Sequence, residues 1–266
     1  MRLSSASLSA LVAVAAVLLG GCGESGDSQA PAGPVGSAGS ARVTGTINVF
    51  AAASLQEAFT KLGKQFEAAH PGSEVVFNFG SSSGLAEQIV QGAPADAFAS
   101  ASTKSMDRVV SGGQASDPRS FVTNKMEIAV PPDNPADIST VADLARKGVK
   151  VALCQAQVPC GATALKVLDN VKVKVTPVTQ EADVKATLSK VKLGEVDAGV
   201  VYVTDVLAAG KSVQGIEIPA HVNASTTYPI AAVTRSKNKA TAQAFVDYVR
   251  SPEGLAALTA AGFAKP

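Results

Sequence analysis

Residues 49–57, with the sequence VFAAASLQE, join an apolar strand pattern to an amphipathic helix pattern through a corner of small residues. Residues 77–86, FNFGSSSGLA, repeat this order of strand, corner and helix. A helix N-terminus presents unpaired N–H groups and a partial positive charge, so each corner is suited to hold an anion. Serine hydroxyls add donors, and neither corner contains Lys, Arg or His. The two corners therefore indicate an α/β protein that binds a small anion through neutral donors.

Strand and helix patterns alternate through the rest of the chain, which favours a mostly parallel sheet flanked by helices. Two extended stretches interrupt the alternation, so we predict two α/β lobes joined by two crossings near Asn124 and Tyr228. A ligand cleft is expected between the lobes, at the carboxyl ends of the strands. The predicted boundaries are residues 45–124 with 229–266 for the first lobe, and 125–228 for the second.

Two local expectations follow from spacing. Ser54 and Glu57 have the separation of a capping box, so the first helix is expected to begin at a Ser54 cap. The alternating pattern of residues 173–178 predicts a strand in the second lobe.

The N-terminal residues are typical of a secretory leader, with Met1-Arg2 followed by a short apolar run. Residues 19–22, LGGC, resemble the bacterial lipobox, which predicts a signal peptide of residues 1–22 ending at a lipidated Cys22. Residues 23–44 are rich in Gly, Ser and Ala and predict a flexible tether. We therefore expect a lipid-anchored protein on the extracytoplasmic face of the cell membrane.

Composition excludes several function classes. The 266-residue chain has a formal net charge of +1 and no Trp, which argues against nucleic acid as a partner. Cys154 and Cys160 are expected to form a disulfide in an oxidising location. Two Cys and two distant His do not make a zinc site, so no metal cation and no cofactor are expected.

One motif suggests an enzyme. Gly80 to Gly84 matches the G-x-S-x-G nucleophile elbow, so a serine hydrolase with Ser82 as nucleophile and His221 as base is an alternative. This alternative is disfavoured because Ser82 follows only the second strand and no Gly-rich oxyanion loop precedes it.

Seven segments resemble, in order, segments of the molybdate-binding proteins of ABC importers: 49–55 (VFAAASL), 81–86 (SSSGLA), 92–98 (GAPADAF), 158–161 (VPCG), 183–184 (DV), 199–205 (GVVYVTD) and 262–263 (GF). The resemblance covers nearly all of residues 46–266. It implies a type II periplasmic-binding-protein fold, no catalysis, and a tetrahedral oxyanion as ligand, either molybdate or tungstate. It also implies a monomer that delivers the anion to an importer permease.

Carried over by position, the resemblance implies ligand contacts at Ser54, Ser82, Cys160, Val184 and Tyr202. Cys160 and Val184 would donate through their backbone N–H groups, and the choice among the three serines of residues 81–83 stays open. Donor chemistry favours molybdate over phosphate, because phosphate carries a proton near neutral pH and would need an acceptor. A receptor for sulfate or another small oxyanion remains an alternative, since sulfate has the same charge and shape as molybdate.

Overall fold

The computed structural model describes residues 42–266. The predicted leader, the Cys22 lipidation site and nearly all of the predicted tether lie outside these residues. Among the helices of residues 42–266, none has both the length and the apolar character needed to cross a membrane.

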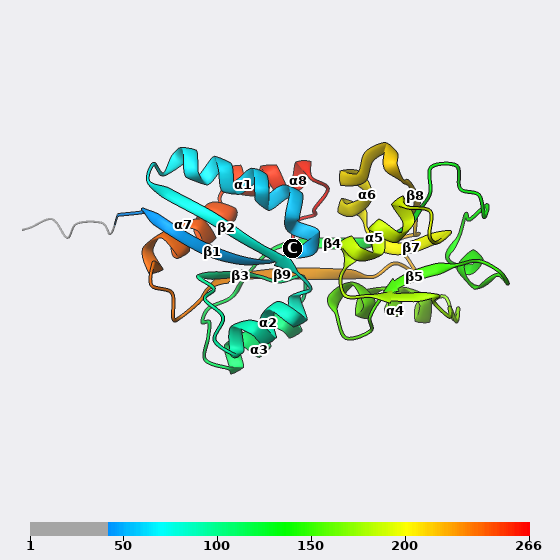
Figure 1. Cartoon of the computed structure of the whole chain (residues 1–266), viewed down its shortest axis with the longest axis horizontal. Helices are drawn as coiled ribbons and strands as arrows, with labels where there is room; N and C mark the ends of the chain where they lie inside the picture. The colour runs from blue at the N-terminus through cyan, green and yellow to red at the C-terminus, as the bar shows by residue number, and fades with distance from the viewer. Residues whose placement is uncertain (1–41) are drawn as a thin grey trace, which may run out of the picture. The chain divides into compact units, whose positions relative to one another are not determined.

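The first lobe is built on parallel pairing of β1 with β2 and β3, and β9 lies antiparallel to β3. Its strands are β1 (Gly45–Ala52), β2 (Ser73–Gly80), β3 (Ala97–Ala99) and β9 (Ser225–Ala232). Its helices are η1 (Ala53–Leu55), α1 (Gln56–Ala69), α2 (Ser82–Val90), α3 (Thr103–Ser111), α7 (Lys239–Val249) and α8 (Pro252–Ala260). Figure 1 shows α1, α7 and α8 on one side of this sheet and α2 and α3 on the other.

Period-two alternation along β1 fills two cores. Ile47, Val49 and Ala51 pack with Phe59 and Phe245 on the α1 and α7 side. The side chain between two of them, Phe50, packs on the opposite side, against α2 and α3. Successive side chains of a strand point to opposite faces, so one apolar segment supplies both layers.

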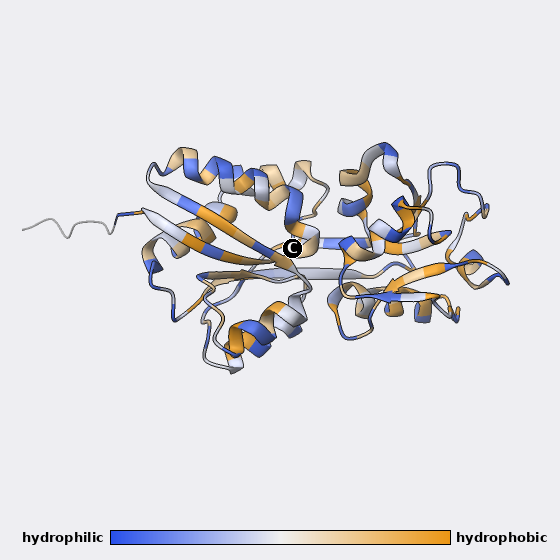
Figure 2. Ribbon diagram, viewed as in Figure 1, coloured by the Kyte–Doolittle hydropathy of each residue, from blue (hydrophilic) through white to orange (hydrophobic). Residues whose placement is uncertain are grey.

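The second lobe contains β5 (Val151–Cys154), β6 (Thr179–Glu181), β7 (Ala198–Tyr202) and β8 (Gln214–Glu217). Its helices are η2 (Val141–Ala145), α4 (Pro159–Asn170), α5 (Val184–Lys192), α6 (Val203–Ala209) and η3 (Gly210–Ser212). All four residues of β5 are buried, and Figure 2 shows this strand as hydrophobic along its length. Helices covering both faces explain why β5 reads as a continuous apolar run.

One long strand, β4 (Arg119–Val130), connects the two lobes. Its first part pairs with β9, ending at the Lys125–Ser225 pair. Its remainder, from Met126, pairs with β7 and β8. The resulting strand order is β2-β1-β3-β9-β4-β7-β5-β6, with β8 beside β4. The predicted α/β class is confirmed.

The strand predicted over residues 173–178 is wrong, because this segment is irregular and β6 begins at Thr179. Val173 and Val175 do pack against the second-lobe core, which accounts for the alternating pattern. Pro177 has no N–H to donate to a sheet ladder, and pairing starts only beyond it.

Candidate functional site

A small cavity of about 20 Å³ lies where corners of both lobes meet. It is lined by the residues that end β1, β2 and β7 and by those that begin α2, α4 and α5. The lining residues are Ala52, Ala53, Ser54, Gly80, Ser81, Ser82, Ala101, Pro159, Cys160, Asp183, Val184 and Tyr202. All five residues that the sequence predicted as ligand contacts are therefore brought together, from five separate segments of the chain.

The first corner holds Ser54 differently from the sequence prediction. Ser54 lies in η1 directly after β1, is 4% exposed, and its hydroxyl is 2.8 Å from the hydroxyl of Tyr228. Neither η1 nor α1 has a side-chain cap, and the Glu57 carboxylate bonds to Lys185 instead. The predicted Ser54–Glu57 capping box is thus wrong, because both side chains find partners more than 100 residues away in sequence.

The second corner separates the roles of its serines. Ser81 is the N-cap of α2, and its hydroxyl accepts a hydrogen bond from the N–H of Gly84. Ser82 is 1% exposed, and its hydroxyl accepts from the N–H of Ala101 at 2.8 Å. Accepting this bond fixes the Ser82 oxygen while leaving its own proton free to be donated. Ser83 does not line the cavity.

The third corner lies between β5 and α4. Cys154 and Cys160 are joined by a disulfide, and Pro159 occupies the first position of α4. Helix geometry leaves the N–H of Cys160, in the first turn, without an intrahelical acceptor. The Sγ atoms tie this donor to the end of β5.

Replacing both cysteines with Ala is expected to lower the free energy of unfolding by about 2 kcal/mol, because the short loop is no longer closed in the unfolded chain. Urea unfolding of the oxidised protein and of the double variant measures this difference. A reductant should destabilise only the protein that has the cysteines, and equal stability of the two proteins would contradict the expectation.

The fourth corner is the start of α5. The Asp183 carboxylate caps the helix by accepting from the N–H groups of Lys185 (2.9 Å) and Ala186 (3.0 Å). Val184, which is 2% exposed, keeps a first-turn N–H that neither the helix nor this cap uses. This N–H is available to a ligand in the cavity.

Tyr202 ends β7 and is 1% exposed. Within residues 42–266 its hydroxyl makes no hydrogen bond of good geometry, although the hydroxyls of Thr163 and Tyr228 lie near enough to affect its pKa. Burial raises the pKa of Tyr202 well above its usual value, so the phenol stays protonated. A buried phenol without a well-formed hydrogen bond, at the wall of the cavity, is a donor that a bound anion would satisfy.

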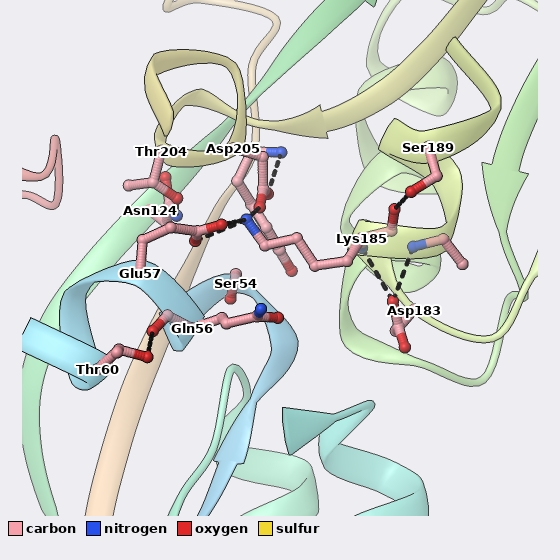
Figure 3. Close-up of polar contacts among 12 residues, drawn as sticks. Ser54, Gln56, Glu57, Thr60, Asn124, Asp183, Lys185, Ser189, Thr204 and Asp205 are labelled. Atoms are coloured by element: carbon pink, nitrogen blue, oxygen red, sulfur yellow. Dashed lines mark hydrogen bonds and ion pairs between the residues drawn. The ribbon is translucent and has the colours of Figure 1, made fainter. Parts of the chain in front are cut away.

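Lys185 is a cation close to the cavity whose role the sequence did not predict. Its ammonium lies 2.7 Å from the Glu57 carboxylate of the first lobe and 2.9 Å from the Asp205 carboxylate of the second (Figure 3). Burial acts to lower the pKa of Lys185, but Asp205 and Glu57 outweigh it and the pKa is raised. The positive charge of Lys185 is therefore paired with two carboxylates. None of the twelve residues that line the cavity is Lys, Arg or His.

The cavity is thus a site of neutral donors at three helix N-termini, those of α2, α4 and α5. Its one carboxylate, Asp183, caps α5 through its Oδ1 atom. No group of three or more His, Cys, Asp or Glu side chains within the described part of the chain is arranged to hold a metal cation. This chemistry suits an anion that accepts hydrogen bonds from every side.

The catalytic pair of the hydrolase alternative is not assembled. His221 is exposed, and the carbonyl of the next residue, Val222, accepts from Asn170 at the last turn of α4. Ser82 shares its cavity with Pro159, at the first turn of the same helix. The 12 residues of α4 separate these two ends by about 16 Å.

Comparisons with known proteins agree with this geometry. The family profile described as "Bacterial extracellular solute-binding protein" matches residues 47–264. Molybdate-binding protein ModA of Mycobacterium tuberculosis (strain ATCC 25618 / H37Rv) is 44% identical over 222 residues, which cover 83% of this chain and 85% of that protein.

Two solved structures share the fold. The periplasmic molybdate-binding protein of Azotobacter vinelandii superposes with a TM-score of 0.74 at 23% identity, covering 83% of this chain and 99% of that one. The sulfate-binding protein SubI of M. tuberculosis H37Rv has a TM-score of 0.70 at 19% identity, covering 82% and 86%. These matches confirm the predicted periplasmic-binding-protein fold but do not distinguish one anion from another.

The profile match covers most of the chain, and the relatives it groups bind solutes rather than convert them, so the protein is not an enzyme. With donors from five segments converging on one small cavity between two lobes, the chain belongs to the family of bacterial extracellular solute-binding proteins.

Proposed function

We propose that this protein binds molybdate in the cavity between its lobes and delivers it to an ABC importer. The observation that carries the proposal is the convergence of Ser54, Ser82, Cys160, Val184 and Tyr202 on one cavity without a cation. The 44% identity to a protein named for molybdate binding supports the same ligand.

The choice of anion rests on proton chemistry and size. Molybdate carries no proton near neutral pH, so four acceptor oxygens meet a site that offers donors. Hydrogenphosphate would bring a proton of its own, and the cavity offers it one acidic group, Asp183, whose Oδ1 atom already accepts from two N–H groups of α5. Tungstate has the charge and nearly the size of molybdate and is proposed as a second ligand. Sulfate is the competing candidate, because it offers the same acceptors on a smaller ion.

Thermal unfolding of the purified protein with molybdate, tungstate, sulfate or phosphate tests the proposal. A ligand at about 100 times its dissociation constant adds about 2.7 kcal/mol of stability, which corresponds to a rise of roughly 5–10 °C in Tm. A rise with molybdate and tungstate alone supports the proposal, and a rise with sulfate alone changes the substrate. If none of the four anions raises the Tm, the proposal that the protein binds an oxyanion is contradicted.

Replacing Ser82 with Ala is expected to weaken molybdate binding by about 1–3 kcal/mol, because a donor to a buried charge is lost. Isothermal titration calorimetry measures the change in affinity. Urea unfolding measures separately the stability that is lost because the N–H of Ala101 is left unpaired. The matched control is Ser83→Ala, since Ser83 does not line the cavity. Equal molybdate affinities of wild type and Ser82→Ala would contradict the assignment of Ser82 as a ligand contact.

We also propose the organisation that places this cavity outside the cell: residues 1–22 as a leader ending at lipidated Cys22, and residues 23–44 as a tether. The lobes are residues 45–124 with 229–266, and residues 125–228, in a monomeric receptor that meets the importer permease. The change of β4 partners after Lys125 supports the first boundary.

Cys22→Ser is expected to move the protein from the membrane fraction to the soluble fraction, because the substitution removes the thioether carrying the acyl chains. Immunoblots of the two fractions measure this, and unchanged membrane retention would contradict the anchor.

A further inference from the structure

Each of three larger cavities shares one lining residue with the ligand cavity. The first lies between α1, α6 and α8 and shares Ser54. The second lies between α2, α3 and the loop before α4 and shares Ser81. The third lies between α3, α4 and β9 and shares Pro159. An ion can approach the ligand cavity from solution through these spaces.

The walls of the first two cavities carry balanced charge. The cavity at Ser54 is lined by one acidic and one basic residue, Glu57 and Lys61. The cavity at Ser81 is lined by two residues of each kind: Glu87, Asp107, Lys104 and Arg108. An anion that approaches along either wall therefore meets attraction and repulsion together.

The third cavity, with a volume of about 410 Å³, has a positive wall. Lys104 and Lys166 line it, and none of its lining residues is acidic. Lys104 lies on α3 of the first lobe and Lys166 on α4 of the second, and Figure 1 shows both helices on the same side of β4 and β9. Neither lysine takes part in an ion pair with another residue of the range 42–266, so both charges are available to an anion.

This positive cavity leads to proposed ligand contacts of the second lobe. Pro159 directly precedes Cys160, whose N–H is one of those contacts. Thr163, one turn further along α4, lines the positive cavity, and its hydroxyl lies near enough to that of Tyr202 to act on the pKa of the phenol. The positive cavity and the ligand cavity therefore meet along the first two turns of α4.

We propose that Lys104 and Lys166 form an outer anion site through which the oxyanion enters the ligand cavity. This inference rests on the proposed oxyanion function and adds the route of binding to it. The two ammonium groups attract a dianion over distances of about 10 Å, whereas the neutral donors of the inner cavity hold it once bound. Capture by charge is thus separated from retention by hydrogen bonds.

Stopped-flow mixing with molybdate tests the route. Tyrosine fluorescence supplies the signal, because Tyr202 lines the ligand cavity and the chain contains no Trp. When Lys104→Gln is combined with Lys166→Gln, the association rate constant is expected to fall by about threefold to tenfold at low ionic strength, with little change in the dissociation rate constant. The difference from wild type should disappear in about 1 M NaCl, where the Debye length is about 3 Å.

Lys61→Gln is the matched control, because Lys61 is also an exposed helical lysine at a cavity that borders the ligand cavity, but it shares that wall with Glu57. Its association rate constant should stay within about twofold of the wild-type value. Replacing Lys104 and Lys166 with Glu should lower the association rate constant further than Gln does, since the charge of the entrance is then reversed.

Two results would overturn the route: an unchanged association rate constant in the double Gln variant, or an equal fall in Lys61→Gln. A change confined to the dissociation rate constant would also overturn it, because the lysines would then act on the bound ion. Failure of the wild-type protein to bind molybdate would instead refute the proposed function itself.

Discussion

Replacing Lys185 with Met is expected to lower the free energy of unfolding by about 3–5 kcal/mol, because it leaves the Asp205 carboxylate buried without its counter-ion. Asp205 is fully buried, and its other oxygen accepts from the N–H of Tyr202 at 3.2 Å. The substitution also removes the ion pair between Lys185 and Glu57 of the first lobe, so we expect the two lobes of the variant to close less tightly around a ligand. Urea unfolding and molybdate calorimetry measure the two effects.

Lys190→Met is the matched control, because the Lys190–Glu195 pair lies on the surface, with side chains 34% and 47% exposed. Exposed pairs contribute about 0–1 kcal/mol, so this variant should unfold almost as wild type does. Losses of similar size in the two variants would contradict the special role of Lys185.

The stability deficit of Lys185→Met should shrink as the pH falls from neutral toward the raised pKa of Asp205. Burial raises the pKa of Asp205 in the wild-type protein, while Lys185 acts in the opposite direction. A carboxyl with a higher pKa in the folded than in the unfolded state binds a proton on folding. Stability therefore falls as pH rises through the folded pKa and recovers below it, and removing the ammonium raises that pKa further. A deficit that grows toward acid pH would show that Asp205 is not the cause.

Replacing Gly161 with Ala is expected to weaken molybdate binding tenfold or more, the value of about one hydrogen bond to a charged group. A Cβ at this position would overlap the carbonyl oxygen of Gln155 and lie 2.7 Å from that of Cys154. Both obstacles are backbone atoms, so the loop before α4 must move, and the N–H of Cys160 moves with it. Strain of this kind also costs about 1–3 kcal/mol of stability.

Calorimetry with molybdate and urea unfolding measure the two effects, with Ala162→Ser as the matched control. Ala162 is the next residue of α4 and is exposed, so an added hydroxyl meets no backbone. Wild-type affinity in Gly161→Ala would show that the position of the Cys160 N–H does not matter to the ligand.

Local patterns predicted most of the architecture, because they depend on neighbours in sequence. Period-two alternation marked β1 as a strand with two apolar faces, and helix patterns after each corner placed α1 and α2. The five residues taken from the family resemblance all line one cavity. The strand expected over residues 173–178 failed because Pro177 prevents pairing that hydrophobic alternation alone suggests.

The partners of the polar side chains were not predictable in this way. Ser54 carries the spacing of a helix cap but bonds Tyr228, 174 residues away, and Glu57 bonds Lys185, 128 residues away. No local sequence pattern marks Asn124 as part of a buried network, because its hydrogen-bond partner Thr204 is 80 residues away in the sequence.

The amino-acid sequence by itself determined the alternation of strands and helices, and the gathering of neutral donors at helix N-termini. Only the tertiary structure decided which hydroxyl is held by which neighbour and which N–H is left free for a ligand. The physical reason is that apolar periodicity acts within each element, whereas a buried polar group must be paired with whatever group folding brings beside it.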